Sequence, residues 1–100
     1  MPDSLTSRQR AYLRKLAHSL KPVVHVGHEG LAAASSSIEE AFNTRELLKV
    51  KVLENAPRDA RETATEIEAA LADVQVAQTI GRTIVLYRAH PQEPEIRLPG

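Results

Sequence analysis

The segment from Pro22 to Leu31 reads PVVHVGHEGL and joins two patterns of different periodicity. Its first five residues include three valines, which is typical of a short buried strand. Gly27 and Gly30 then interrupt the strand, and from Leu31 the apolar residues recur at helical spacing. The sequence therefore predicts a strand, a turn with glycine at both ends, and a helix that follows at once.

A capping pattern begins the helix that precedes this segment. Thr6 and Gln9 form T-x-x-Q, so we expect a helix from Thr6 to about Leu20, stopped by Pro22. Its predicted apolar face consists of Tyr12, Leu13, Leu16, Ala17 and Leu20. Downstream, the pattern predicts a helix from Leu31 to about Phe42. A strand is then expected over residues 46–53, with Leu48, Val50 and Val52 on one face and solvent on the other.

A third helix is expected from Pro57 to about Val74, with most of its acidic residues off the apolar stripe. Strands are predicted over residues 76–80 and 83–88, joined by a tight hairpin at Gly81-Arg82, and the tail from Ala89 is expected to be extended. The order α-β-α-β-α-β-β indicates an α/β fold, a single compact domain over residues 1–100. We expect a four-stranded mixed sheet backed by three helices, with a core over residues 5–88 and a tail over 89–100.

Composition excludes several classes of protein. The chain of 100 residues has zero formal net charge and no cysteine, which rules out disulfides and thiolate zinc sites. Its three aromatic residues are too few for a surface that stacks many bases. Every uncharged stretch is far shorter than the roughly 20 residues of a membrane span. With no signal-like N-terminus, we expect a cytoplasmic protein that does not bind membranes.

Charge is distributed unevenly along the chain. Residues 1–28 have a net charge of +4, residues 29–81 of −5 and residues 82–100 of +1. The predicted first helix and the residues after it carry a row of cations with no acid among them: Arg8, Arg10, Arg14, Lys15 and Lys21. Such a row is either a solvated face or a surface for a polyanion. We expect these cations and the glycine turn to share one surface.

The Gly27–Gly30 turn is the candidate binding motif. Two glycines between a strand and a helix let a sugar–phosphate backbone approach the free N–H groups of a helix N-terminus. KH domains clamp single-stranded nucleic acid with a G-x-x-G loop of this kind. A plain strand-to-helix turn is the alternative reading. His28 and Glu29 fill the turn, and the charge of Glu29 would repel a phosphate.

Four segments in the expected order resemble a known family. Residues 5–18 read LTSRQRAYLRKLAH, residues 20–31 contain LKPVV and the glycine turn, residues 46–52 read ELLKVKV and residues 80–88 read IGRTIVLYR. Together they are similar to the YhbY family of stand-alone bacterial CRM (chloroplast RNA splicing and ribosome maturation) domains. The resemblance covers nearly the whole chain. Acidic Glu29 and His28 depart from the family, which often has basic or small polar residues there.

The resemblance implies an RNA-binding domain similar to the C-terminal domain of translation initiation factor 3. It also implies association with ribosomal RNA of precursor large (50S) subunits, with the Gly27–Gly30 loop and neighbouring basic residues in contact with RNA. We expect a monomer that is not an enzyme, with no cofactor and no small-molecule substrate. The rival reading is a protein-interaction module whose acidic third helix binds a protein partner on the ribosome.

The remaining candidate residues have weaker patterns. Arg82, at the hairpin tip, is a candidate phosphate contact. Lys49, Lys51 and Arg88 are either solvated or an auxiliary RNA surface. His25 and His28 form an H-x-x-H pair without a third ligand, so we expect no metal site. A hydrolase built on His28 and Glu29 would lack both a nucleophile and a second carboxylate.

Overall fold

The computed structural model describes residues 4–100, and its seven elements follow the predicted order. The helices are α1 (Ser7–Ala17), α2 (Leu31–Ala41) and α3 (Ala60–Ala70). The strands are β1 (Val24–Val26), β2 (Leu47–Val52), β3 (Gln75–Ile80) and β4 (Thr83–Tyr87). They pair in the order β1-β2-β4-β3, with β1 parallel to β2 and the other pairs antiparallel. The α/β fold with a four-stranded mixed sheet and three helices is confirmed.

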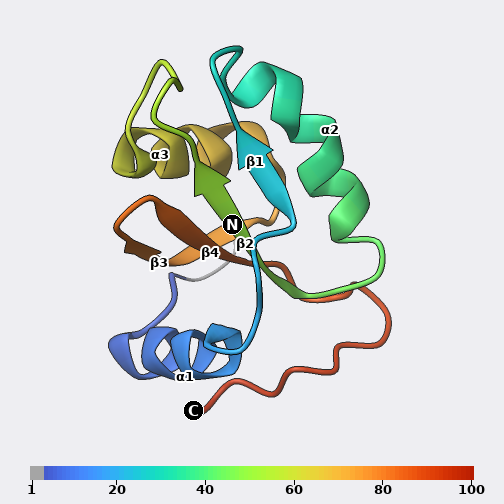
Figure 1. The fold of residues 1–100 in the computed structure, drawn as a ribbon. Coiled ribbons are helices and arrows are strands. Elements are labelled where there is room, and N and C mark those ends of the chain that lie inside the picture. The colour runs from blue at the N-terminus through green and yellow to red at the C-terminus, as the bar shows by residue number, and fades with distance from the viewer. Residues whose placement is uncertain (1–3) are drawn as a thin grey trace.

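Both faces of the sheet are used in packing. Helices α2 and α3 cover one face, where Ile38 and Ile67 pack against Val50 and Leu86 in the larger core (Figure 1). Helix α1 packs on the other face, where Leu13 and Ala17 meet Leu47, Val85 and Tyr87. The prediction that residues 46–53 have one solvated face was therefore wrong at the start of the strand. Leu47 is buried because α1 lies over that end of β2.

The predicted apolar face of the first helix was too wide. Only Leu13 and Ala17 are buried, whereas Tyr12, Leu16 and Leu20 each remain 37% exposed. The physical reason is that α1 packs on the sheet and beside the C-terminal tail, and no second helix covers its flanks within residues 4–100. One row of side chains reaches the sheet, and the neighbouring rows stay at the surface.

The observed helix ends differ from the predicted ones because of local capping and backbone conformation. Helix α1 ends at Ala17, before the predicted Leu20, and the chain then turns toward the sheet. Helix α3 begins at Ala60 because Asp59 caps it in a reciprocal capping box with Glu62, so Pro57 lies in the preceding loop. Helix α3 ends at Ala70 because the next residue, Leu71, is extended, which leaves Val74 outside the helix. None of the helices in residues 4–100 is long and apolar enough to span a bilayer.

Candidate nucleic-acid interface

The Gly27–Gly30 loop forms a tight turn between β1 and α2. The Gly30 N–H donates to the Gly27 carbonyl oxygen at 3.0 Å and closes it. Gly30 has a φ of 76°, and a Cβ there would lie 3.2 Å from Cγ of Pro57, so the fold itself requires this glycine. Gly27 has neither constraint, because a Cβ there would meet only Leu53 Cδ1, at an ordinary 3.8 Å. The missing side chain of Gly27 leaves bare backbone where a ligand can approach.

Helix α2 begins at this loop without a side-chain cap. Its N-cap is Gly30, whereas Thr6 caps α1 and Asp59 caps α3 through side-chain oxygens. Its first turn also contains no acidic residue. The first N–H groups of α2 therefore lack an intrahelical or side-chain acceptor and carry the positive end of the helix dipole. This arrangement suits an anion such as a phosphate group.

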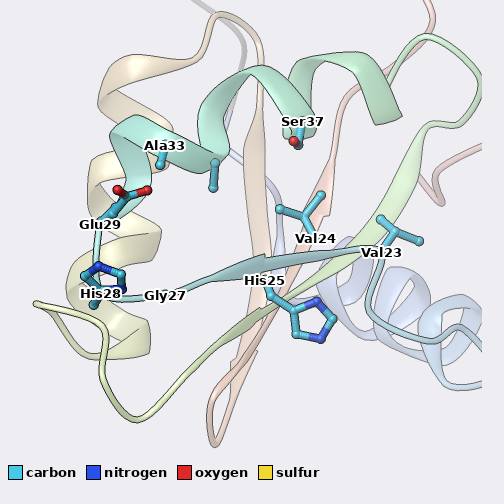
Figure 2. A pocket seen from close by; sticks show the side chains of 10 residues that line it. Val23, Val24, His25, Gly27, His28, Glu29, Ala33 and Ser37 are labelled. Atoms are coloured by element: carbon cyan, nitrogen blue, oxygen red, sulfur yellow. The ribbon is translucent and has the colours of Figure 1, made fainter.

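A groove extends from the loop between β1 and α2. It has a volume of about 320 Å³ and runs past Gly27, Glu29 and the α2 side chains Ala33 and Ser37 (Figure 2). The small side chains of α2 leave room beside the backbone. On the other side of the groove is β1, an edge strand whose outer backbone groups are not used in pairing with β2. An extended chain can lie along this groove and reach backbone donors at its end.

The charge of the groove differs from our expectation. Its lining includes His25, His28 and Glu29 but no lysine or arginine. The cations of α1 do not join it, because α1 packs at the start of β2 whereas the loop follows the end of β1, at the opposite end of the parallel pair (Figure 1). The expectation that the glycine turn and these cations share one surface was therefore wrong. A phosphate at the loop would be bound by backbone N–H groups.

The α1 cations form a separate surface. Arg8, Arg10, Arg14 and Lys15 of α1, and Lys21 in the segment after it, are all exposed, and none forms an ion pair with a carboxylate of residues 4–100. Arg14 and Lys15 line a cavity together with Lys49 of β2. Lys51 is exposed on the same face of the sheet as Lys49. The structure thus brings Lys49, one of the auxiliary candidates, beside the first helix.

The two hairpin arginines have partners within the protein. Arg82 Nη1 lies 3.1 Å from Glu54 Oε1, with both side chains mostly exposed. Arg88 Nη1 lies 3.1 Å from Glu39 Oε2, and its guanidinium is 4.9 Å from the centre of the Phe42 ring. Arg88 therefore ties the end of β4 to α2, whereas Arg82 keeps an exposed guanidinium at the hairpin tip.

The two histidines of the H-x-x-H pair do not converge (Figure 2). Figure 2 shows the imidazoles of His25 and His28 apart, on the strand and on the loop. Within residues 4–100, no three histidine, aspartate or glutamate side chains are grouped so that they could hold a metal ion.

Sequence reasoning missed the role of Glu46. This residue is only 8% exposed, and its carboxylate accepts hydrogen bonds from the backbone N–H groups of His90, Glu95 and Ile96 at 2.7, 2.8 and 2.8 Å. Burial would raise the pKa of Glu46, but the three hydrogen bonds outweigh it and hold the pKa below its usual value. The tail thereby returns to α1, where Ile96 and Leu98 join the smaller core (Figure 1).

Comparison with known proteins identifies the family. The family model for the CRS1 / YhbY (CRM) domain matches residues 5–88. The chain belongs to the CRM domain family. It is 40% identical over 96 residues to "Probable RNA-binding protein YqeI" of Bacillus subtilis, covering 95% of this chain and 99% of that protein.

Two further relatives match over nearly the whole chain. An "RNA-binding protein" of Haemophilus influenzae is 40% identical over 99 residues, which is 96% of both chains. The solution structure of the hypothetical protein SAV1595 from Staphylococcus aureus superposes on this CRM domain with a TM-score of 0.79 at 38% identity. That match covers 95% of this chain and 99% of the other. The overall fold described above is therefore shared by a solved structure.

Proposed function

We propose that this CRM domain protein binds RNA and that it uses two surfaces to do so. The observation that carries the proposal is the combination of a bare-backbone groove at the uncapped start of α2 with unpaired cations on α1. Relatives that match nearly the whole chain are named as RNA-binding proteins. The groove residues are Gly27, His28, Glu29 and Gly30, and the cationic residues are Arg8, Arg10, Arg14, Lys15 and Lys21, with Arg82 at the hairpin.

The two surfaces differ in how they bind a phosphate. At the loop, N–H groups of α2 donate to phosphate oxygens, so contact depends on a close backbone approach. On α1, exposed arginine and lysine side chains release counterions from the RNA, which makes this contribution strongly dependent on salt. Contacts of both kinds go to the sugar–phosphate backbone and carry little information about base sequence. The proposed domain therefore recognises RNA mainly by shape and charge.

We further propose that the RNA is ribosomal RNA in precursors of the large (50S) subunit, bound in the cytoplasm by a monomer without a cofactor. In this proposal the protein assists ribosome assembly and catalyses no reaction. The cationic surface suits a long structured polyanion of this kind, because its charges have no acidic partners within residues 4–100.

Co-sedimentation with ribosomal particles tests this function. The double variant Arg14→Glu with Lys15→Glu should reduce co-sedimentation with precursor large subunits by at least about tenfold and leave the circular dichroism spectrum unchanged. The matched comparison uses single variants: Lys15→Glu should weaken association more than Arg58→Glu, which makes the same charge change beside α3. Retained co-sedimentation of the double variant would contradict the proposed surface.

Ribonuclease treatment separates RNA binding from recruitment by a protein. Under the rival proposal, the acidic face of α3 binds a protein partner, and association would survive digestion of the RNA. The structure gives these acids local roles: Glu62 belongs to the capping box, Glu66 pairs with Arg58 at 3.3 Å, and Glu68 accepts the Val76 N–H at 2.9 Å. We therefore expect digestion of the RNA to release the protein.

A further inference from the structure

Helix α1 covers only one end of the sheet face on which it lies. Beyond Leu47, Val85 and Tyr87, the next rows of the same face have no helix over them within residues 4–100. One of these rows crosses all four strands in register and consists of His25, Lys51, Thr83 and Ile80. Ile80 is 48% exposed, although it is a large apolar residue in a strand. The boundary between α1 and these rows is therefore a place where apolar and cationic groups meet.

A pocket of about 500 Å³ lies at this boundary. Its apolar lining comes from both sides, with Ala11 and Ala17 on α1 and Ile80 and Val85 on the sheet. Its basic lining consists of Arg14, Lys15, His18 and Lys49, and it includes no carboxylate. The volume is within the range of about 300–1,000 Å³ that is usual for small-ligand sites.

Lys49 is held in place at this pocket. Its Nζ donates a hydrogen bond to the Leu20 carbonyl oxygen at 3.1 Å, which fixes the ammonium group near the end of α1. The acceptor is neutral, so the positive charge of Lys49 has no compensating carboxylate among residues 4–100. Arg14 and Lys15 likewise form no ion pair there. The pocket thus combines three cations that lack an acidic partner with an apolar surface. A ligand that suits it has an anionic group and a flat apolar group.

We propose that this pocket takes one unpaired nucleotide of the bound RNA, with its base against Ile80 and its phosphate near Arg14, Lys15 and Lys49. The inference rests on the proposed RNA-binding function and adds a preference for RNA that offers an unstacked base. A base inside a continuous duplex is stacked on both faces and cannot enter a concave pocket, whereas a bulged or single-stranded base can. An acidic peptide is the alternative occupant, but the surface is continuous with the row of α1 cations proposed above for RNA.

The pocket and the Gly27–Gly30 loop lie at separate places on the domain. The pocket lies beside α1 and reaches Ile80 on β3, at one edge of the sheet, whereas the Gly27–Gly30 loop follows β1, the strand at the other edge. One RNA that reaches both sites binds more tightly than either contact alone provides, because the second contact forms within the complex. The domain therefore favours a folded RNA with an extended strand in one place and an unpaired nucleotide in another.

Two hairpin RNAs of the same sequence, one with a single bulged uridine and one fully paired, test the proposal. Fluorescence anisotropy with purified protein should show at least about fivefold tighter binding of the bulged hairpin. Ile80→Ser should abolish this preference and leave affinity for the paired hairpin almost unchanged, since Ile80 meets only the base. Leu16→Ser is the matched control, because Leu16 is exposed on α1 but does not line the pocket.

A lysine pair tests the phosphate contact. Lys49→Gln removes the charge but retains a donor for the Leu20 carbonyl oxygen, and Lys51→Gln makes the same change on the same face outside the pocket. Lys49→Gln should reduce the preference for the bulged hairpin, whereas Lys51→Gln should weaken both hairpins equally or not at all.

The outcomes distinguish this inference from the proposed function. If the wild type binds both hairpins equally, or if Ile80→Ser retains the preference, the pocket proposal is overturned and RNA binding stands. If neither hairpin nor a single-stranded RNA binds at low salt, the proposed function itself fails. If a glutamate- and leucine-rich peptide binds wild type but not Ile80→Ser, and RNA does not compete with it, the pocket belongs to a protein partner and the proposal is overturned.

Discussion

The carboxylate of Glu46 accepts a 2.7 Å hydrogen bond from the backbone N–H of His90, which lies 44 residues later in the chain. Two more hydrogen bonds, from Glu95 and Ile96, reach its other oxygen. A buried acid next to β2 therefore attaches the tail that packs beside α1. Since the tail contacts α1, we expect this attachment to help hold the helix that carries the proposed cationic surface.

Glu46→Gln should destabilise the fold by about 1–3 kcal/mol. Glutamine has one carbonyl oxygen and one amino group, so at least one backbone N–H of the tail loses its acceptor and faces a donor. Urea unfolding measures the change. Glu93→Gln is the control, since Glu93 is exposed and should shift stability by less than about 0.5 kcal/mol. Equal stability of the two variants would contradict the role given to Glu46.

The same carboxylate predicts a dependence of stability on pH. Because the pKa of Glu46 is lower in the folded protein than its ordinary value of 4.5, the group stabilises the fold fully above that pH. This contribution is lost as the pH falls through the folded-state pKa. The stabilities of wild type and Glu46→Gln should therefore differ at neutral pH and converge in acid. A difference that stays constant from neutral to acidic pH would refute this assignment.

Tyr87 offers a second titration that reports the same region. Burial, with a smaller contribution from the charge of Glu46, raises the pKa of Tyr87 above its ordinary value of 10.0. In a Tyr12→Phe background, ultraviolet absorbance follows Tyr87 alone, because it is then the one tyrosine left. Adding Glu46→Gln should move the midpoint down. A midpoint that does not move would show that Glu46 and Tyr87 are not coupled.

The two glycines of the loop should respond differently to alanine. Gly30→Ala should cost about 1–2 kcal/mol of stability, because its φ of 76° disfavours a side chain and the Cβ would crowd Pro57. Gly27→Ala has room for its methyl group, so it should retain stability and weaken RNA binding several-fold by blocking close approach of the backbone. Thermal unfolding and anisotropy measure the two effects. Unchanged RNA binding by Gly27→Ala would argue against the loop as a contact.

Removing the acid from the loop should strengthen binding. Glu29 is exposed beside the uncapped start of α2, where it repels the phosphate that the helix attracts. Glu29→Gln should therefore raise RNA affinity by about threefold to tenfold at low salt, and less at high salt. Glu93→Gln, with the same net charge, should have little effect. A loss of affinity in Glu29→Gln would mean that the acid contacts RNA favourably.

The elements and their order could be predicted from the sequence because they depend on local signals. The T-x-x-Q cap at Thr6, the glycine at Gly81 and the alternation along β2 each act within a few residues. The predictions were wrong where contacts between residues far apart in the sequence determine the structure. Helix α1 packs on the sheet by one row because no second helix covers its flanks within residues 4–100, and Glu46 is buried because residues 90–96 return to it.

The candidate site likewise has features that could be predicted from the sequence and features that could not. The Gly27–Gly30 loop lies where it was predicted because its turn depends on local features, the positive φ of Gly30 and the strand and helix beside it. The separation of the loop from the α1 cations could not be predicted. The distribution of charged residues in the sequence does not determine against which end of the sheet a helix packs. The pocket at Lys49 and Ile80 arises from that packing and has no signal in the sequence.

An NMR titration with RNA tests the central claim most directly. Amide resonances of the 15N-labelled protein are followed as a bulged hairpin RNA is added. The largest shifts should occur at Gly27–Leu31, with a second group at Arg14, Lys15 and Lys49, while the outer face of α3 stays unchanged. Shifts confined to α3, or an undisturbed Gly27–Leu31 segment at saturation, would contradict the account.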